Sequence, residues 1–401
     1  MDGPLEGVRV VEVSMWAMVP ATGAILAEWG ADVLKIEGPQ GDPVRALVTA
    51  GITPEGPRFT WEMWNRGKKA MALDLNHTEA QAILHDLVKD ADVFLTSILP
   101  GQRAKLGIDL DAIRAANPTI VYGSGSGTGQ KGPEANKGGY DGITFWARSG
   151  AAASATPAGS DPIGMPAGAF GDATSGMALA GGVAAALAKK FRTGEGSVVE
   201  ASLLGTAMWA MQMWITGARA AGLEDMPRPT REQPFNVLVN TYRTADGRWL
   251  SLSMLQADAY WAGFCEAIGR SDMVDDPRFV DAKARGEHTA ECLAELDATF
   301  LAQPLAHWTE RLAAQEGQWD VLRKVSEVLD DPQVVANTFA HRVEYPDGHE
   351  LMLVQSPVQF DQVPGTVRPA PDFGADTDAE LEALGWDTER IIEAKIKGAV
   401  V

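Results

Sequence analysis

Hydrophobic and polar positions change their spacing repeatedly along the first two hundred residues. Short apolar runs rich in β-branched residues are typical of strands, and apolar positions three or four residues apart are typical of helices. Strand-like runs occur at residues 8–14, 32–37, 68–75, 92–97, 119–127 and 197–203, and helix-like stretches at 20–30, 78–90 and 173–191. This alternation predicts an α/β fold with a mostly parallel sheet and helices packed on its faces.

The pattern changes near residue 224, where a polar, proline-rich stretch (224–236) predicts a linker. The later residues predict a hairpin at 240–254, helices near 257–269, 286–300 and 305–315, a second hairpin at 345–350, and a short amphipathic helix within 376–386. A chain of 401 residues is too long for one ordinary core. We therefore predict a large α/β domain that begins with residues 1–223, a smaller α+β domain at 224–330, and a C-terminal segment, 331–401, that returns to the large domain.

Composition and charge exclude several classes of function. The formal net charge of −20 argues against a nucleic-acid partner, because phosphate binding needs clustered Lys and Arg. The apolar runs are too short to span a membrane, and the first residues lack the pattern of a signal peptide, so we expect a cytoplasmic protein. Six scattered histidines and two cysteines, Cys265 and Cys292, have no metal-type spacing. We therefore expect no metal, and structural thiols.

An isolated acidic residue lies in the stretch "MPAGAFGDATSG", residues 165–176. Asp172 is surrounded by small and apolar residues and directly precedes the helix-like stretch. One interpretation is a helix N-cap, because Asp accepts a backbone N–H bond there and meets the positive end of the helix dipole. The other is a catalytic carboxylate in a turn that substrate can approach closely. The local sequence leaves both open.

Three other features are candidates for binding. The loop "YGSGSGTGQKG" (122–132) misses the spacing of a dinucleotide fingerprint, but it follows a strand, where α/β sheets bind ligands. A basic cluster at 65–69 could contact phosphates or form a solvated loop; it contains Asn65, Arg66, Lys68 and Lys69. Trp16, Trp61 and Trp64 could line an apolar pocket or pack in a core. No GxSxG nucleophile elbow is present.

An ordered series of motifs resembles the family III CoA-transferases, also called the CaiB/BaiF family, over nearly the whole chain. The family includes formyl-CoA transferase and carnitine CoA-transferase. The motifs include "LAEWGADVLKIEGPQGDPVR", "WNRGKKAMALDL", "ADVFLTSILPGQRAKLGID", "GGYDGITFWARSGA", "GAFGDATSGMALAGGVAAAL" and "APDFGADTDAELEALG". The resemblance implies a large Rossmann-like domain built from both ends of the chain, and a homodimer of two interlocked rings.

The resemblance also implies a role for Asp172, because the family's catalytic aspartate falls in its "GDxxSG" motif. A carboxylate can attack the thioester carbonyl of an acyl-CoA and form a mixed anhydride, which the CoA thiolate converts to an enzyme–CoA thioester. An incoming carboxylic acid then leaves as its CoA ester. With an ordinary pKa of about 3.9, Asp172 would already be ionised at neutral pH. Nearby N–H groups could stabilise the oxyanions. Acyl-CoA is a substrate here, and no cofactor is expected to stay bound.

The resemblance further implies a set of CoA-binding positions: Trp16, Ala17, Met18, Leu73, Ser97, Ile98, Lys105, Tyr140 and Asp141. The chain departs from the family at several of them. Ala17 replaces a glutamine of formyl-CoA transferase, and Ser97 and Ile98 stand where many members have Asn and an aromatic residue. Lys105 stands where an arginine is common, which keeps the charge but loses the bidentate fork.

Two alternatives to a homodimeric transferase remain. The superfamily contains α-methylacyl-CoA racemases, which use a histidine where this chain has Tyr140, and an unperturbed tyrosine is a poor base at neutral pH. Some members form heteromers in which one subunit lacks the aspartate; this chain would be the active subunit. The three tryptophans suggest a large or hydrophobic acyl group, whereas the acceptor acid itself is not encoded in any motif.

Overall fold

A computed structural model describes residues 3–47, 58–157 and 159–401. The chain divides into two compact units. The large unit comprises Met1–Glu224 and Pro332–Val401, and the small unit comprises Asp225–Asp331. Each unit has a hydrophobic core of its own. We describe them separately.

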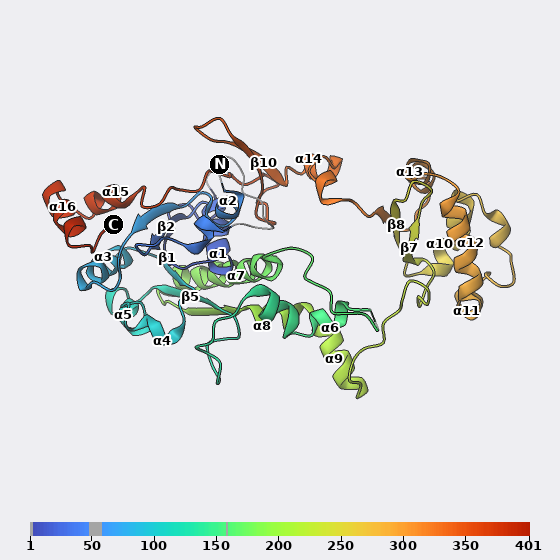
Figure 1. Ribbon diagram of the computed structural model, residues 1–401, viewed down its shortest axis with the longest axis horizontal. Helices are drawn as coiled ribbons and strands as arrows, with labels where there is room; N and C mark the ends of the chain where they lie inside the picture. Colours follow the sequence, from blue (N-terminus) through green and yellow to red (C-terminus); the bar gives the residue numbers. More distant parts are fainter. Residues whose placement is uncertain (1–2, 48–57, 158) are drawn as a thin grey trace. The chain divides into compact units, whose positions relative to one another are not determined.

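A six-stranded parallel sheet forms the centre of the large unit (Figure 1). Its strands are β1 (Arg9–Val13), β2 (Asp32–Glu37), β3 (Lys69–Ala72), β4 (Val93–Thr96), β5 (Val121–Ser126) and β6 (Val198–Ser202). The spatial order is β3-β2-β1-β4-β5-β6, and every neighbouring pair is parallel. The predicted α/β fold with a mostly parallel sheet is therefore confirmed, and its strand order is that of a Rossmann-like sheet.

Helices cover both faces of this sheet because successive strand residues point to opposite sides. Val10 packs with α1 (Met18–Glu28) and α7 (Phe170–Thr193) in one core cluster. Val11 packs on the other face with α3 (Thr78–Lys89) and α5 (Leu110–Ala116). Helices α1 and α7 lie against each other (Figure 1). The remaining elements of this part of the chain are η1 (Pro43–Ala46), α2 (Phe59–Asn65), α4 (Pro100–Arg103), η2 (Asp141–Ala147), α6 (Ala151–Ala155), α8 (Leu203–Ala210) and α9 (Gln212–Ala221).

The C-terminal segment packs against the N-terminal half of the large unit. It contains α14 (Pro332–Ala336), the hairpin β10 (Ala340–Glu344) and β11 (Glu350–Val354), and helices α15 (Thr377–Ala383) and α16 (Thr388–Ile396). The Ala70 amide donates to Asp376 (2.8 Å), and Leu73 forms an isolated bridge with Val400. The Ser356 amide donates to the buried Glu28 (2.6 Å). Both ends of the chain thus build one core.

The small unit is a three-stranded antiparallel sheet with helices. Its strands are β7 (Val239–Arg243), β8 (Trp249–Ser253) and β9 (Trp319–Val321), and its helices are α10 (Ala257–Ala267), η3 (Ser271–Met273), α11 (Ala282–Glu287), α12 (Thr289–Leu301), α13 (Leu305–Leu312) and η4 (Val325–Glu327). Strands β7 and β8 confirm the hairpin predicted at 240–254. Cys265 and Cys292 are both buried in its core, where burial raises the pKa of each thiol to about 12.

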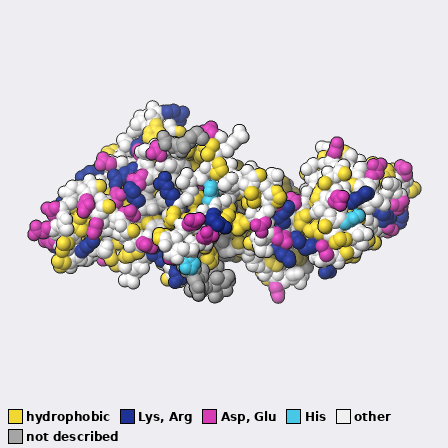
Figure 2. All heavy atoms as spheres, turned by 90° about the horizontal axis from the view of Figure 1, so that it is seen from above, with side chains coloured by type: hydrophobic (Ala, Val, Ile, Leu, Met, Phe, Trp, Pro, Cys, Tyr) yellow, Lys and Arg dark blue, Asp and Glu magenta, His cyan; other side chains and the backbone are white. Residues whose placement is uncertain are grey.

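Charged residues of both signs are distributed over the surface. On the face drawn in Figure 2, Asp and Glu side chains are interspersed with Lys and Arg side chains. Within the described residues, no helix is long and apolar enough to cross a membrane.

Candidate active site

The strand order of the large unit reverses between β1 and β4, and such a switch point is where α/β sheets bind ligands at the carboxyl ends of the strands. The turn after β1 leads through Trp16 and Ala17 into α1. Ser97 directly follows β4, and its Oγ accepts a hydrogen bond from the Met15 amide (3.0 Å). The structure therefore brings Ser97, one of the CoA-binding positions implied by the resemblance, next to the turn that leads through Trp16 and Ala17 to Met18.

A cavity of about 160 Å³ opens beside this turn, at the carboxyl ends of β1, β2 and β3. Ser14, Met15, Leu73 and Ile98 are among the residues that line it, so two further predicted positions meet here. Lys105 is exposed. Hydrogen bonds from Asn76 hold the pKa of Asp74, which also lines the cavity, below its usual range, and the positive charge of Lys105 adds to this effect.

Asp172 lies in the first turn of α7, which begins at Phe170. The N-cap position belongs to Ala169, so the interpretation of Asp172 as the N-cap is wrong. Ala169 has a left-handed backbone (φ 58°), which is uncommon for a residue with a side chain. Gly171 has no room for a side chain, because a Cβ there would overlap Phe145 and Asp141.

The side chain of Asp141 performs the capping role from a separate segment. Its carboxylate accepts hydrogen bonds from the Gly171 amide (3.0 and 3.1 Å) and from the Asp172 amide. The Asp141 side chain is buried, and burial raises its pKa while these amide bonds lower it. The Ala173 amide bonds to Ala169 O (2.9 Å). The amides of Gly171, Asp172 and Ala173 are therefore already bonded within the protein.

The environment of Asp172 changes its acidity. Burial, followed by the negative charge of Asp141, raises the pKa of Asp172 to about 7. Both causes act in the same direction, because each disfavours the charged carboxylate. The expectation of an ordinary pKa near 3.9 is therefore wrong for this structure. Near neutral pH, Asp172 exists as a mixture of carboxylate and carboxylic acid.

An aromatic wall connects Asp172 to the switch-point turn. The rings of Trp16 and Tyr140 meet edge to face with centroids 5.6 Å apart, and Tyr140 is directly followed by Asp141. Phe170, the first residue of α7, meets Phe145 edge to face with ring centroids 6.2 Å apart. Tyr140 is 57% exposed and Phe170 is 44% exposed, so both leave apolar surface free beside Asp172. Ala17 and Met18 are buried, and Met18 packs with Phe145.

Two of the three predicted tryptophans do not take part in this wall. Trp61 is buried in α2, where the Arg45 guanidinium lies 3.5 Å from its ring centre and its indole N–H donates to Pro371 O (3.1 Å). Trp64 lies on the same short helix. The helix-like stretches predicted from the sequence do not include this one, and the buried Trp61 takes the core position that the sequence offers as an alternative to a pocket.

The basic cluster after α2 is neither a solvated loop nor a free phosphate site. Arg66 forms an ion pair with Glu28, and Lys69 pairs with Asp32 and Glu380. Lys68 is buried and pairs with Glu12 at 2.8 Å. Burial lowers the pKa of Lys68 to about 8, although Glu12 opposes this shift.

Two glycines of the loop at 122–132, Gly125 and Gly127, allow other segments to pack closely against it. A Cβ at Gly125 would overlap Val19 of α1, so this glycine allows the helix to approach β5 closely. Gly127 and Gly139 approach each other similarly, since a Cβ on Gly127 would lie 2.7 Å from the Gly139 Cα. This second contact brings the segment before Tyr140 to the end of β5.

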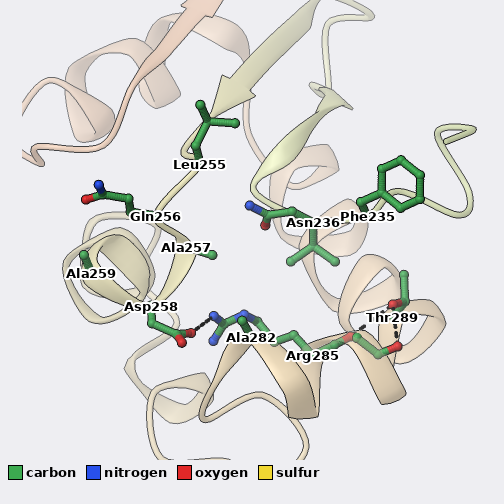
Figure 3. A pocket seen from close by; sticks show the side chains of 12 residues that line it. Phe235, Asn236, Leu255, Gln256, Ala257, Asp258, Ala259, Ala282, Arg285 and Thr289 are labelled. Carbon is green, nitrogen blue, oxygen red and sulfur yellow. Dashed lines mark hydrogen bonds and ion pairs between the residues drawn. The ribbon is translucent and has the colours of Figure 1, made fainter. Parts of the chain in front are cut away.

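A separate cavity of about 420 Å³ lies in the small unit (Figure 3). Arg285 in its wall is buried, donates to Phe279 O (2.6 Å) and pairs with Asp258. Phe235 and Leu255 lie at its opposite side. None of the site residues predicted from the sequence, all of them described, lines this cavity. Among the described residues, no group of three or more His, Cys, Asp or Glu is arranged to hold a metal ion.

Sequence comparisons match this chain to CoA-transferases. Residues 5–377 match the sequence profile of CoA-transferase family III. The chain is 34% identical to the (R)-2-hydroxy-4-methylpentanoate CoA-transferase of Clostridioides difficile, over 96% of this chain and 97% of that protein. It is 28% identical to the cinnamoyl-CoA:phenyllactate CoA-transferase of Clostridium sporogenes, over 96% and 95%.

The fold agrees with a solved structure as well. A CaiB/BaiF family protein from Brucella suis superposes with a TM-score of 0.83 at 25% identity, covering 96% of this chain and all of that one. A profile match of this length, together with relatives matched from end to end, establishes the family. The chain belongs to the family III CoA-transferases.

Proposed function

We propose that this enzyme transfers CoA between carboxylic acids through covalent intermediates on Asp172. The observation that carries the proposal is the position of this carboxylate: it lies in the first turn of α7, beside an exposed aromatic wall that continues into the switch-point turn of the sheet. An ionisable group whose pKa is shifted by burial and by a specific neighbouring charge, as that of Asp172 is, is a typical feature of a catalytic site.

The reaction has four balanced steps. The Asp172 carboxylate attacks the thioester carbonyl of the donor, and the carbon–sulfur bond breaks to give a mixed anhydride and CoA thiolate. The thiolate attacks the aspartyl carbonyl and releases the donor acid, which leaves an enzyme–CoA thioester. The acceptor carboxylate attacks this thioester to form a second anhydride and thiolate. The thiolate then attacks the acceptor's acyl carbonyl, which releases the new acyl-CoA and regenerates Asp172.

In this proposal, CoA binds along a path on the large unit between the strand-end cavity and Asp172. The cavity lined by Leu73 and Ile98 lies at one end, the Met15–Trp16 turn crosses the switch point, and Asp172 lies at the other end. Lys105 supplies a positive charge near the cavity for a phosphate. Trp16, Ser97 and Tyr140 are placed along this path. The buried Asp141 fixes the end of this path at Asp172, because its carboxylate accepts hydrogen bonds from the first-turn amides of α7.

The acceptor is an acid with a branched or aromatic side chain. The exposed surfaces of Tyr140 and Phe170 next to Asp172 favour apolar substituents over a small diacid. Two relatives are named for 2-hydroxy-4-methylpentanoate and for phenyllactate, which both have such side chains. Trp61, which is buried away from this wall, does not contribute to the argument.

A homodimer of two interlocked chains is the proposed assembly. Helix α9 has no buried residue, and Trp209 and Met213 on the α8–α9 segment are 72% and 68% exposed. Large apolar side chains exposed together are typical of a surface that a partner covers. A second copy of the chain would bury them.

The function is tested by mixing the protein with one acyl-CoA and a panel of acids, and identifying newly formed CoA esters by mass. Efficient transfer to 4-methylpentanoate-type or phenyl-substituted acids supports the proposal, whereas a preference for formate or oxalate contradicts the acceptor class. Exchange of the α-proton in D₂O without transfer would instead indicate a racemase. Loss of transfer in Asp172→Ala, but not in a matched Asp161→Ala control on an exposed loop, assigns the reaction to Asp172.

A further inference from the structure

Three of the four residues in the turn between β1 and α1, Ser14, Met15 and Trp16, are each held by a hydrogen bond from outside the turn. Lys35 Nζ donates to Ser14 O (2.9 Å), the Met15 amide donates to Ser97 Oγ (3.0 Å), and the Trp16 amide donates to Asp42 Oδ1 (3.1 Å). Trp16 has a φ of 70°, a left-handed conformation that a bulky residue rarely adopts. Such a conformation persists only where the surroundings impose it, and it is frequent at functional sites.

Asp42 uses both carboxylate oxygens at this turn. Oδ1 accepts from the amides of Trp16 and Val44 (3.1 and 3.0 Å), and Oδ2 forms an ion pair with Lys35 Nζ at 3.0 Å. The Asp42 amide donates to Glu37 Oε2 (2.8 Å), which fixes the backbone as well. The side chains of Asp42 and Lys35 are completely buried.

A buried ion-pair network holds Asp42 and Lys35 in place. Lys35 also pairs with Glu12 (3.2 Å), and Glu12 pairs with Lys68 (2.8 Å), all with fully buried side chains. A Cβ at Gly23 of α1 would overlap Glu12 and Lys68, so the helix leaves space for the network. Buried charges of this kind are held firmly, because any movement leaves a charge without its partner.

Trp16 connects this network to the segment that holds Asp172 in place. Its ring meets Tyr140 edge to face, and the neighbouring Asp141 holds the first-turn amides of the helix that carries Asp172. We propose that Asp42, held by Lys35, is a positioning residue for CoA transfer: it keeps Trp16 in its left-handed conformation and so fixes the wall between the strand-end cavity and Asp172. This inference rests on the proposed function. Asp42 is among the residues that line the strand-end cavity, but both of its carboxylate oxygens are engaged by Lys35, Trp16 and Val44.

The substitution Asp42→Asn tests this role with little change in shape. An amide has one oxygen, so in either orientation its NH₂ group faces a donor, either Lys35 Nζ or the Trp16 and Val44 amides. The matched control is Leu34→Ala. Leu34 precedes Lys35 on β2 but is buried on the opposite face of the sheet, so this substitution destabilises the same strand without touching the turn. Denaturant midpoints measure the loss of stability in both variants.

We expect Asp42→Asn to lower the rate of enzyme–CoA thioester formation at saturating acyl-CoA by about tenfold or more, because small misplacements in a site have effects of this size. Leu34→Ala should stay within about twofold of the wild type at an equal folded fraction. Asp42→Glu keeps the charge opposite Lys35 and serves as a second variant if Asp42→Asn does not fold; its longer side chain should also slow the reaction. Equal rates in wild type and a folded Asp42 variant would overturn the inference.

A double-mutant cycle separates positioning from a general structural role. Glycine adopts a positive φ without strain, so Trp16→Gly removes both the ring and the need to impose the conformation. Adding Asp42→Asn to Trp16→Gly should then slow thioester formation by less than about twofold, whereas additive losses would overturn the inference. If the wild type forms no enzyme–CoA thioester at all, the proposed function fails. If the wild type forms it and Asp42→Asn forms it equally fast, only the positioning role fails.

Discussion

The carboxylate of Asp141 accepts hydrogen bonds from the first-turn amides of α7, and its charge acts on Asp172 in the same turn. One residue therefore fixes the position of the proposed nucleophile and also changes its acidity. The two carboxylates lie 31 positions apart in the sequence. Their relationship links the geometry of the site to its dependence on pH.

The pH dependence of catalysis should reflect the raised pKa of Asp172. Only the carboxylate is a nucleophile, so kcat/KM should rise by about tenfold per pH unit below pH 7 and level off above it. In Asp141→Asn the negative neighbour is removed while an oxygen still accepts from Gly171, so the midpoint should move to lower pH. Asp161→Asn, on an exposed loop, is the control and should leave the midpoint unchanged. Identical midpoints in wild type and Asp141→Asn would refute the coupling.

Stability should depend on pH through the same residue. A carboxyl group whose pKa is higher in the folded than in the unfolded protein contributes stability below the unfolded value, and this contribution is lost as the pH rises through about 7. Asn at position 172 does not titrate, so the Asp172→Asn variant does not lose this stability as the pH rises. Its free energy of unfolding should therefore increase relative to wild type by about 2–3 kcal/mol between pH 5 and pH 8. Urea titrations at both pH values measure the difference, and a constant offset would contradict the assignment.

Close packing of α1 on α7 depends on Gly176. A Cβ there would lie 2.6 Å from Met18 O and 2.8 Å from the Ala21 Cβ, and Thr22 Oγ1 donates to Gly176 O (3.0 Å). Gly176→Ala should push the helices apart and cost about 1–3 kcal/mol of stability.

The matched control for this packing is Gly181→Ala in the same helix, where no atom lies within 4 Å of the added carbon. This variant should be more stable by about 0.5–1 kcal/mol, because alanine is the better helix former. Thermal or urea unfolding of the two variants distinguishes packing from helix propensity. If both variants shift in the same direction, the close contact is not the cause.

Self-association should depend on the exposed apolar face of α8 and α9. Trp209→Ser removes the largest exposed side chain there and should raise the dissociation constant of the dimer by about tenfold or more. Ile396→Ser removes an 81% exposed side chain on α16 and serves as the control. Sedimentation velocity over a range of concentrations measures both. A wild-type chain that sediments as a monomer throughout would contradict the proposed assembly.

The sequence predicts those parts of the fold that depend on local spacing. Runs such as 32–37 and 78–90 have the periodicity of the element they form, and the hairpin at 240–254 has its turn residues in place. Asp172 could be singled out because an acid among small residues before a helix is locally unusual. The spatial order of the strands was not accessible in this way, because pairing joins residues far apart in the chain.

The features that sequence analysis missed arise from contacts of long sequence separation. Lys68 looks like part of a charged loop, but it is buried against Glu12, 56 positions earlier. The sequence leaves a pocket and a core position open for Trp61, and the contact with Pro371 of the C-terminal segment, which buries it, has no local signal. The capping of α7 by Asp141 leaves no local pattern near residue 172, which is why the local sequence keeps an N-cap role for Asp172 open. Only the resemblance to a known family pointed to Asp141 at all.

The most direct test of the account is the mass of the intact protein after brief incubation with an acyl-CoA. We predict an adduct with the mass of a CoA thioester that maps to Asp172, that hydroxylamine converts to a hydroxamate, and that is absent from Asp172→Ala. An adduct on a different residue, or transfer activity retained in Asp172→Ala, would contradict the central claim that CoA passes through the Asp172 carboxylate.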